Sequence, residues 1–388
     1  MKKSLILFLG LSLLLASCKV KEYHTNKEEA NTHKKDTNKE EVQYHGKEYK
    51  LKGDEDLKDL KYPQEKHFKN VKQLTFKGDN AEGYWSFDGK QLVFQAHNEN
   101  WGDHCDQIYV MDAFKGLGKP GNKAKLISTG KGRTTCSYFL PDGNILYAST
   151  HEGGDDCPPE PKRTDGYVWG IYPSYDIYVA SPEGKIIKKL TDSPGYDAEA
   201  TVSPKGDKMV YTSTKSGDIE LWTMDIDGSN KKQVTHELGY DGGAFFSPDG
   251  TKLIFRSSRP KTKEEVKKYK DLLARDLVEP VDMELYICDV DGSNLKQITR
   301  LGNANWSPYF LPSGKKVIFS SNHKSKKGFP FNLFMVNLDG TGLEQVTYGH
   351  VFESFPVFSP DGKYLVFASN RNNGGTRDTN LFLAEWVD

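Results

Sequence analysis

The sequence predicts an all-β fold, a six-bladed β-propeller of four-stranded antiparallel blades. One turn phrase returns six times along the chain, and two further strand phrases follow it in a constant order. The composition agrees, because 36 glycines and 12% aromatic residues suit a turn-rich chain with a large core. Short strands that recur in one repeating unit are typical of a WD-like propeller, whose blades stand around an axis.

Charge and composition exclude several classes of function. The chain has 53 Lys and Arg against 54 Asp and Glu, and its net charge of -1 excludes a basic nucleic-acid-binding groove. Five cysteines are too few for a small disulfide-stapled scaffold. Beyond the N-terminus, no apolar run approaches the ~20 residues that span a bilayer. We expect the bulk of the chain to be globular and soluble.

The N-terminus has the pattern of an export signal that ends in a lipid anchor. Lys2 and Lys3 precede an apolar run over residues 5–16, which has the length of a signal-peptide core. The run ends in Leu-Ala-Ser-Cys at 15–18, which resembles the bacterial lipoprotein box. The resemblance implies removal of residues 1–17 and acylation of Cys18, which would anchor the chain in a membrane. The alternative is an ordinary secretory signal with an incidental cysteine.

A polar linker is predicted over residues 18–66. Lys, Glu, Asn, Thr and His dominate it, with scarcely any aliphatic residue before Leu51. Such a segment buries too little apolar surface to offset its chain entropy. The alternative is a small folded domain. Residues 67–388 form the predicted propeller.

Each predicted blade contains the same tight turn, in which Pro and Gly set the backbone. An apolar strand ending in Phe or Tyr usually follows it. The six copies are Ser86–Gly89, Leu140–Gly143, Ser203–Gly206, Ser247–Gly250, Leu311–Gly314 and Ser359–Gly362.

Two further phrases complete the unit of four strands. An apolar strand ends in an Asp-x-Asp-Gly turn, as at 221–228 and 285–292, and a Gln-x-Thr phrase follows, as at 233–235, 297–299 and 345–347. The phrase Gln73-Leu74-Thr75 has no blade before it, while the last unit stops after three strands at Trp386. We expect this N-terminal strand to close the ring as the outer strand of the last blade, which removes an open sheet edge.

The Ser-Pro-Asp-Gly turn and the Gln-Leu-Thr-type strand resemble the TolB-like propeller repeat family over roughly residues 70–388. TolB has an additional N-terminal α/β domain, which the polar segment here cannot supply. The resemblance implies partners in the cell envelope, because the propeller of TolB engages a peptidoglycan-associated lipoprotein. It does not imply an activity, since unrelated proteins carry this repeat.

One face of the predicted ring carries the long connections, which join second to third strands. Elaborated loops on a rigid scaffold are where recognition usually occurs. The first strands begin on this face near the axis, and they predict an acidic mouth that binds a protein or peptide. The mouth residues are Glu82, Asp197, Glu199, Asp241, Asn305 and Glu353, and the aromatic anchors are Trp85, Tyr196, Tyr240 and Trp306.

Two structural alternatives remain open for these residues. Cationic or imidazole side chains recur at the second-strand ends, and they can form inter-blade ion pairs with the carboxylates. The aromatic residues can belong to the core. The recurring side chains are His151, Lys215, Arg259, His323 and Arg371.

The fourth blade has a predicted helical insertion. Thr262 to Glu265 reads as a capping box, and Val266, Tyr269, Leu273 and Leu277 follow at helical spacing before Pro280. The helix either packs on the rim or acts as a lid or docking element.

The cysteines predict one disulfide in the exported protein. Cys105, Cys136 and Cys157 all fall on the loop-rich face, and the pairing most favoured joins Cys157 to Cys105 or Cys136. Cys288 lies in a strand and is expected to be buried. A zinc site is a weaker alternative, because no closely spaced cysteine pair is present.

The search for catalytic motifs favours a non-catalytic protein. The chain has no G-x-S-x-G elbow, no H-E-x-x-H and no P-loop. We expect a monomeric propeller without cofactor or metal, anchored in the cell envelope. Lys19 after the anchor favours the outer membrane over the inner one, with the propeller periplasmic or surface-exposed. The alternative is a metal-dependent carbohydrate-active enzyme resembling oligogalacturonate lyase, with His97, His151, His236, His323 and His350 as candidate ligands.

Overall fold

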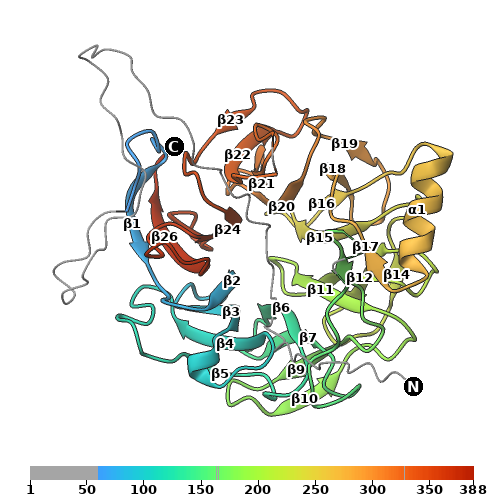
Figure 1. Cartoon of the computed structure of the whole chain (residues 1–388), viewed down its shortest axis with the longest axis horizontal. Helices are drawn as coiled ribbons and strands as arrows, with labels where there is room; N and C mark the ends of the chain where they lie inside the picture. The colour runs from blue at the N-terminus through green and yellow to red at the C-terminus, as the bar shows by residue number, and fades with distance from the viewer. Residues whose placement is uncertain (1–59, 163, 165, 327) are drawn as a thin grey trace, which may run out of the picture. The chain divides into compact units, whose positions relative to one another are not determined.

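The structure is a computed structural model, and it describes residues 60–162, 164, 166–326 and 328–388. These residues form six four-stranded antiparallel sheets around an axis (Figure 1), which confirms the predicted propeller. The predicted signal peptide, the lipidation site Cys18 and linker residues 18–59 lie outside the described residues.

Each of the first three blades runs from an inner to an outer strand in chain order, except for one insertion. Blade 1 contains β2 (Asp79–Trp85), β3 (Gln91–His97), β4 (Gln107–Asp112) and β5 (Lys125–Leu126). Blade 2 contains β6 (Thr134–Phe139), β7 (Ile145–Ser149), β9 (Asp176–Ala180) and β10 (Ile186–Lys189). Blade 3 contains β11 (Asp197–Val202), β12 (Lys208–Ser213), β13 (Glu220–Asp225) and β14 (Lys232–Gln233).

The last three blades follow the same order, and the ring closes in blade 6. Blade 4 contains β15 (Asp241–Phe246), β16 (Lys252–Ser257), β18 (Glu284–Asp289) and β19 (Lys296–Gln297). Blade 5 contains β20 (Asn305–Phe310), β21 (Lys316–Ser321), β22 (Asn332–Asn337) and β23 (Glu344–Gln345). Blade 6 contains β24 (Glu353–Phe358), β25 (Tyr364–Ser369), β26 (Asn380–Trp386) and the N-terminal β1 (Phe68–Gln73).

The closure is the predicted one. Strand β1 pairs antiparallel with β26, with Val71 opposite Ala384 and Gln73 opposite Phe382, and the two strands lie side by side in Figure 1. The threonine of the Gln-x-Thr phrase explains why this phrase repeats. Its hydroxyl accepts a hydrogen bond from the backbone N–H of the third strand, as from Leu221 to Thr235 at 2.9 Å and from Leu381 to Thr75 at 2.8 Å.

Two insertions meet outside the blades. Strand β8 (Trp169–Gly170) of the blade 2 insertion pairs with β17 (Leu277–Val278) of the blade 4 insertion. Helix α1 (Lys263–Leu273) precedes β17 and begins with the predicted capping box of Thr262 and Glu265. Leu277 lies in β17 and not in the helix, because the helix ends at Leu273 before its apolar pattern does.

The described residues begin before the predicted boundary at residue 67. Residues 60–66 were expected to be linker, and the structure packs them against blade 6. Glu65 has no exposed surface there, because it pairs with Arg371 from the opposite end of the chain. We call residues 60–66 the N-terminal strap.

Candidate functional site

The two faces of the ring differ as predicted in the length of their connections. On one face, which we call the loop-rich face, residues 98–106, 150–175, 258–283, 322–331 and 370–379 connect second to third strands. The turns of the opposite face are short, except for residues 113–124 of blade 1. Where the repeated turn begins with serine, the hydroxyl of this serine organises the turn. Ser359, for example, donates to Asp361 at 2.6 Å and accepts from the N–H of Tyr364 at 3.0 Å.

The predicted acidic mouth residues are mostly buried, so an open ring of carboxylates is not what the structure presents. Asp241, Asn305 and Glu353 have no exposed surface, and Asp197 and Glu199 are exposed by 1% and 9%. Buried charges require partners. Arg259 donates to both oxygens of Asp241 at 2.6 and 2.8 Å. These carboxylates therefore organise the protein interior.

The five recurring side chains at the second-strand ends make ring contacts within their own blade, and not the inter-blade ion pairs that the structural alternative expected. Each of the five side chains lies over an aromatic ring of the third strand of its blade. The centroid distances are 4.5 Å for His151–Tyr178, 5.6 Å for Lys215–Trp222, 5.3 Å for Arg259–Tyr286, 4.5 Å for His323–Phe334 and 5.9 Å for Arg371–Phe382.

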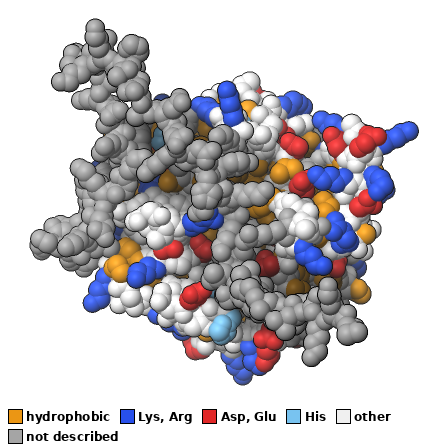
Figure 2. All heavy atoms as spheres, viewed as in Figure 1, with side chains coloured by type: hydrophobic (Ala, Val, Ile, Leu, Met, Phe, Trp, Pro, Cys, Tyr) orange, Lys and Arg blue, Asp and Glu red, His pale blue; other side chains and the backbone are white. Residues whose placement is uncertain are grey.

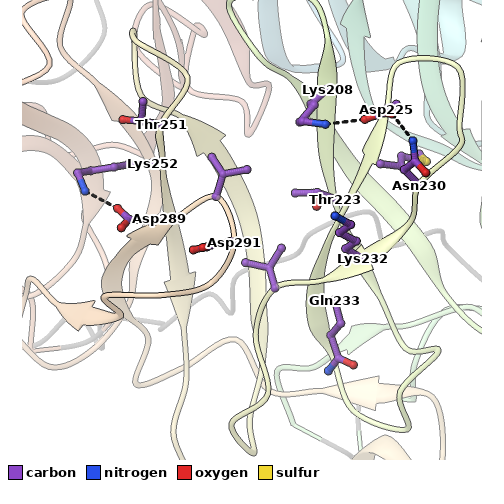
Figure 3. Close-up of a pocket in the computed structure, with 13 residues that line it drawn as sticks. Lys208, Thr223, Asp225, Asn230, Lys232, Gln233, Thr251, Lys252, Asp289 and Asp291 are labelled. Atoms are coloured by element: carbon purple, nitrogen blue, oxygen red, sulfur yellow. Dashed lines mark hydrogen bonds and ion pairs between the residues drawn. The ribbon is translucent and has the colours of Figure 1, made fainter.

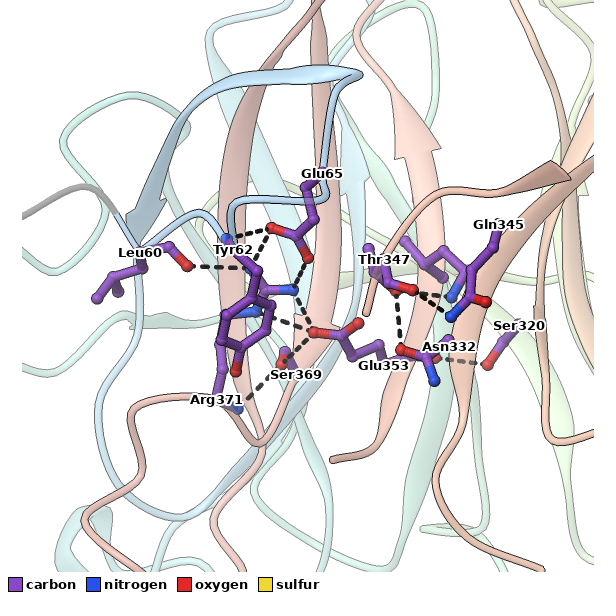
Figure 4. Close-up of polar contacts among 11 residues, drawn as sticks. Leu60, Tyr62, Glu65, Ser320, Asn332, Gln345, Thr347, Glu353, Ser369 and Arg371 are labelled. Atoms are coloured by element: carbon purple, nitrogen blue, oxygen red, sulfur yellow. Dashed lines mark hydrogen bonds and ion pairs between the residues drawn. The ribbon is translucent and has the colours of Figure 1, made fainter. Parts of the chain in front are cut away.

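Blade 6 adds the N-terminal strap to this arrangement (Figure 4). Arg371 donates to Glu65 at 2.8 and 3.2 Å and to Glu353 at 2.9 Å, while the ring of Tyr62 lies 4.6 Å from its guanidinium. Burial raises the pKa of Glu65, although Arg371 opposes this shift. One arginine therefore binds two carboxylates inside the protein.

A second set of residues forms a ring at the axis, which we call the axial ring. Every inner strand has a β-bulge at the same position, where one residue takes a positive φ and the pairing register shifts. The six residues of the axial ring are Glu82, Cys136, Glu199, Gly243, Ser307 and Phe355, with φ between 44° and 58°.

Arg256 takes the place that Gly243 leaves free in the axial ring. A Cβ at Gly243 would lie 2.1 Å from Nη1 of Arg256, so any other residue at this position would have to displace the guanidinium. Arg256 binds Glu199 at 2.5 Å and Tyr240 at 2.6 Å, and Glu199 also accepts from Thr212. This cluster is a true inter-blade ion pair, between blades 3 and 4.

Aromatic rings close the axis two residues beyond the axial ring. Tyr84 contacts Tyr138 at 5.3 Å and Phe245 at 5.9 Å, and Phe245 contacts Tyr309 at 5.1 Å between ring centroids. Blades 1 and 4 are opposite each other, so these rings meet across the axis. The axial ring is therefore approached from the loop-rich face, where the inner strands begin.

A chain of aromatic side chains lies at this end of the axis, and we call it the aromatic arc. Its members are Trp169, Trp306, Phe331, Phe329, Phe352 and Phe355, with successive centroid distances of 4.7 to 6.5 Å. Trp306 and Phe331 are buried, whereas the other four are partly exposed. Trp169 also lies 5.4 Å above the Arg256 guanidinium.

Of the four predicted anchors, only Trp306 belongs to the aromatic arc. Tyr240 is 1% exposed within the Arg256 cluster, and Tyr196 packs on Tyr175 at 5.6 Å. Trp85 is buried and donates to the carbonyl of Val357 at 3.2 Å. The sequence reasoning missed Trp169, Phe329 and Phe352, which lie in insertions or connections that do not repeat.

The four cysteines of the described residues divide as one bonded pair and two free thiols. Cys105 and Cys157 form a disulfide that ties the long connections of blades 1 and 2 together. Cys136 is free in the axial ring, and Cys288 is free and buried. Burial and the neighbouring carboxylates Glu82 and Glu199 raise the pKa of Cys136 well above its ordinary value.

The candidate metal ligands do not gather in the described part of the chain. His151 and His323 each bind a serine of their own blade, at 2.9 and 2.8 Å. Among the described residues, no three His, Cys, Asp or Glu side chains lie together as a metal site. None of the described helices is long and apolar enough to cross a membrane.

A groove of about 670 Å³ lies between blades 3 and 4 on the opposite face (Figure 3). Lys208 binds Asp225 at 2.6 Å on one side, and Lys252 binds Asp289 on the other. Acidic and basic side chains are also interspersed over the face drawn in Figure 2. Most of the charged side chains that line the groove are therefore paired with one another.

The comparisons with known proteins concern the propeller. A family model described as the TolB beta propeller domain matches residues 172–277. A TolB homolog from Chlorobium luteolum is 35% identical over 51 residues, which are 13% of this chain and 12% of the relative. An uncharacterized protein from Agrobacterium fabrum is 28% identical over 154 residues, or 38% of this chain and 43% of the relative. The chain thus spans less than half the length of each.

Two solved structures share the fold. A candidate TolB from Agrobacterium tumefaciens matches with a TM-score of 0.52 at 21% identity, over 80% of this chain and 91% of that one. TolB from Acinetobacter baumannii matches with a TM-score of 0.51 at 19% identity, over 77% and 64%. Together with the repeats, these matches confirm the predicted resemblance: the chain carries a TolB-like β-propeller.

Proposed function

We propose that this chain is a lipid-anchored, non-catalytic protein-binding module of the bacterial cell envelope. A segment of the partner binds at the loop-rich face, at the end of the axis. The observation that carries the proposal is the aromatic arc, where four partly exposed rings lie together on the face with the long connections. Aromatic side chains dominate the energy of protein interfaces, because each buries a large area with little loss of conformational entropy.

The cellular location rests on the N-terminal pattern and on the family resemblance. The lipoprotein-like segment ending at Cys18 supports an anchor in the outer membrane, with the propeller periplasmic or surface-exposed. The relative from Chlorobium luteolum is a TolB homolog, and the solved structure from Acinetobacter baumannii is TolB. The propeller acts as a monomer in this proposal.

A metal-dependent lyase is not proposed. The histidines at the second-strand ends bind serines and aromatic rings of their own blades, which occupies them structurally. No contact among the described residues favours that activity over partner binding.

The test is recovery of partners from detergent-solubilised envelopes with the tagged full-length chain. The variant Phe329→Ala with Phe352→Ala should lose the bound partner or reduce it at least tenfold. Leu343→Ala is the matched control, since Leu343 is 41% exposed in a turn of the opposite face. If the double variant recovers the same partners in the same amounts, the aromatic arc is not the binding surface. Charge reversal at Asp241 or Glu353 does not serve here, because both are buried.

A further inference from the structure

The axial ring contains two carboxylates, Glu199 and Glu82. Glu199 has a full set of hydrogen-bond donors, and Glu82 does not. Glu199 accepts from Thr212 at 2.8 Å, from Tyr240 at 2.8 Å, from the N–H of Gly243 at 2.7 Å and from Arg256. Glu82 accepts from Tyr84 at the long distance of 3.3 Å, and its other neighbour is the weak donor Cys136. Glu82 is also partly exposed.

The charge of Glu82 is not balanced within the axial ring. Burial raises the pKa of Glu82, and the nearby carboxylate of Glu199 raises it further. Arg256 is the cation of this cluster, and its hydrogen bonds go to Glu199 and Tyr240. A second cation beside Glu82 would restore the charge balance.

The same end of the axis already accommodates one guanidinium between aromatic rings. Arg256 lies 5.4 Å from the ring centroids of both Trp169 and Tyr240. Trp306 in the aromatic arc is 7% exposed, and its indole N–H has no hydrogen-bond partner among the residues that the structure describes. A buried donor without a partner is costly, and an acceptor on a ligand would satisfy it.

We propose that the partner segment inserts a lysine or arginine side chain toward Glu82, with an adjacent apolar side chain on the aromatic arc. The Trp306 N–H then donates to a backbone carbonyl of the segment. This inference rests on the proposed function and adds the chemistry of the partner.

The test uses three peptides that differ at one position, with the purified full-length protein. Acetyl-Gly-Phe-Lys-Phe-Gly-amide is compared with its norleucine and glutamate analogues by titration calorimetry. The lysine peptide should bind at least tenfold more tightly than the norleucine peptide, and the glutamate peptide most weakly. Glu82→Gln should abolish the preference for lysine, while Glu183→Gln on the opposite face should preserve it.

The outcomes separate this inference from the proposed function. If the lysine and norleucine peptides bind wild-type protein equally and both lose affinity in the Phe329 and Phe352 variant, the aromatic arc binds segments but Glu82 does not select a cation. That result overturns the inference and leaves the proposed function standing. If no peptide binds and envelope partners do not depend on the aromatic arc, both fail. The norleucine comparison needs no variant, so a folding defect in Glu82→Gln cannot hide the answer.

Discussion

Blades 4 and 6 place the same arginine at the same repeat position, yet each surrounds it differently. In blade 4, Arg259 pairs with buried Asp241 and with Glu237, whose side chain is 62% exposed. In blade 6, Arg371 pairs with buried Glu353 and with Glu65 of the N-terminal strap, and none of these three side chains is more than 2% exposed. The repeat supplies the pair of an arginine with a buried carboxylate in both blades. The neighbouring residues determine how far this pair is shielded from solvent.

The preceding blade also contributes a different residue near each arginine. Near Arg259 it is Glu220 of blade 3, which accepts a hydrogen bond from Thr235 and whose pKa burial raises to about 8. The corresponding residue near Arg371 is neutral Asn332 of blade 5, whose carbonyl oxygen lies 3.5 Å from the Thr347 hydroxyl (Figure 4).

The difference teaches how the ring is completed at its closure. Blade 6 is assembled from both ends of the chain, and the N-terminal strap adds a carboxylate that the repeat does not supply. We infer that the strap is an integral part of the propeller and not the start of the linker. Three changes test this comparison.

The largest effect is expected from removing the arginines. Arg371→Ala leaves Glu65 and Glu353 buried without a cation, and it should lower the free energy of unfolding by about 5 kcal/mol. Arg259→Ala leaves one buried carboxylate in direct contact and should cost about 3 kcal/mol. Urea unfolding of both variants measures the difference. Equal losses would mean that the strap carboxylate carries no charge or is not buried.

The next effect is the pH dependence that Glu220 gives to the blade 4 side. Its pKa in the folded protein is raised to about 8 from an ordinary 4.5, so the folded state keeps a proton that the unfolded chain releases. Stability should therefore fall as the pH rises from about 5 to 8, by on the order of 4 kcal/mol. Glu220→Gln should flatten this fall, as measured by urea unfolding across that range. An unchanged pH profile would contradict the raised pKa.

The smallest effect separates the two outer carboxylates. Glu65→Ala removes two charge-assisted hydrogen bonds to a buried guanidinium and should cost about 2 kcal/mol. Glu237→Ala removes an exposed contact and should change stability by less than about 0.5 kcal/mol. Thermal and urea unfolding of the two single variants provide a matched pair. If Glu65→Ala does not lower the free energy of unfolding, residues 60–66 belong to the linker and not to the propeller.

Much of the fold was readable from the sequence, because its signals are local and repeated. The six turns hold through Ser or Asp side chains within a few residues, and the Thr of the Gln-x-Thr phrase caps the neighbouring strand of the same blade. The unpaired phrase at Gln73 to Thr75 predicted the closure with β26. The capping box at Thr262 predicted where the helix begins, but apolar spacing could not show that Leu277 had entered a strand.

The site was less readable, because its contacts join segments that do not repeat. The carboxylates were placed correctly along their strands, and the ion-pair alternative already included Arg259 and Arg371, but it expected pairs between blades and not buried pairs within one blade. Trp169 belongs to an insertion and Phe352 to a connection between blades. The repeat pattern does not predict where the side chains of such segments lie. Glu65 looked like linker, since its partner lies 306 residues away.

The most direct test of partner binding at the loop-rich face is photocrosslinking in cells from single positions of the full-length chain. Benzoylphenylalanine in place of Phe352 should crosslink to an envelope protein upon irradiation, whereas the same group in place of Leu343 should not. Analysis of the crosslinked peptide should find the site in a segment that contains a basic residue beside an apolar one. Crosslinks of equal yield from both positions, or none from position 352 in an envelope where the protein is folded and abundant, would contradict the account.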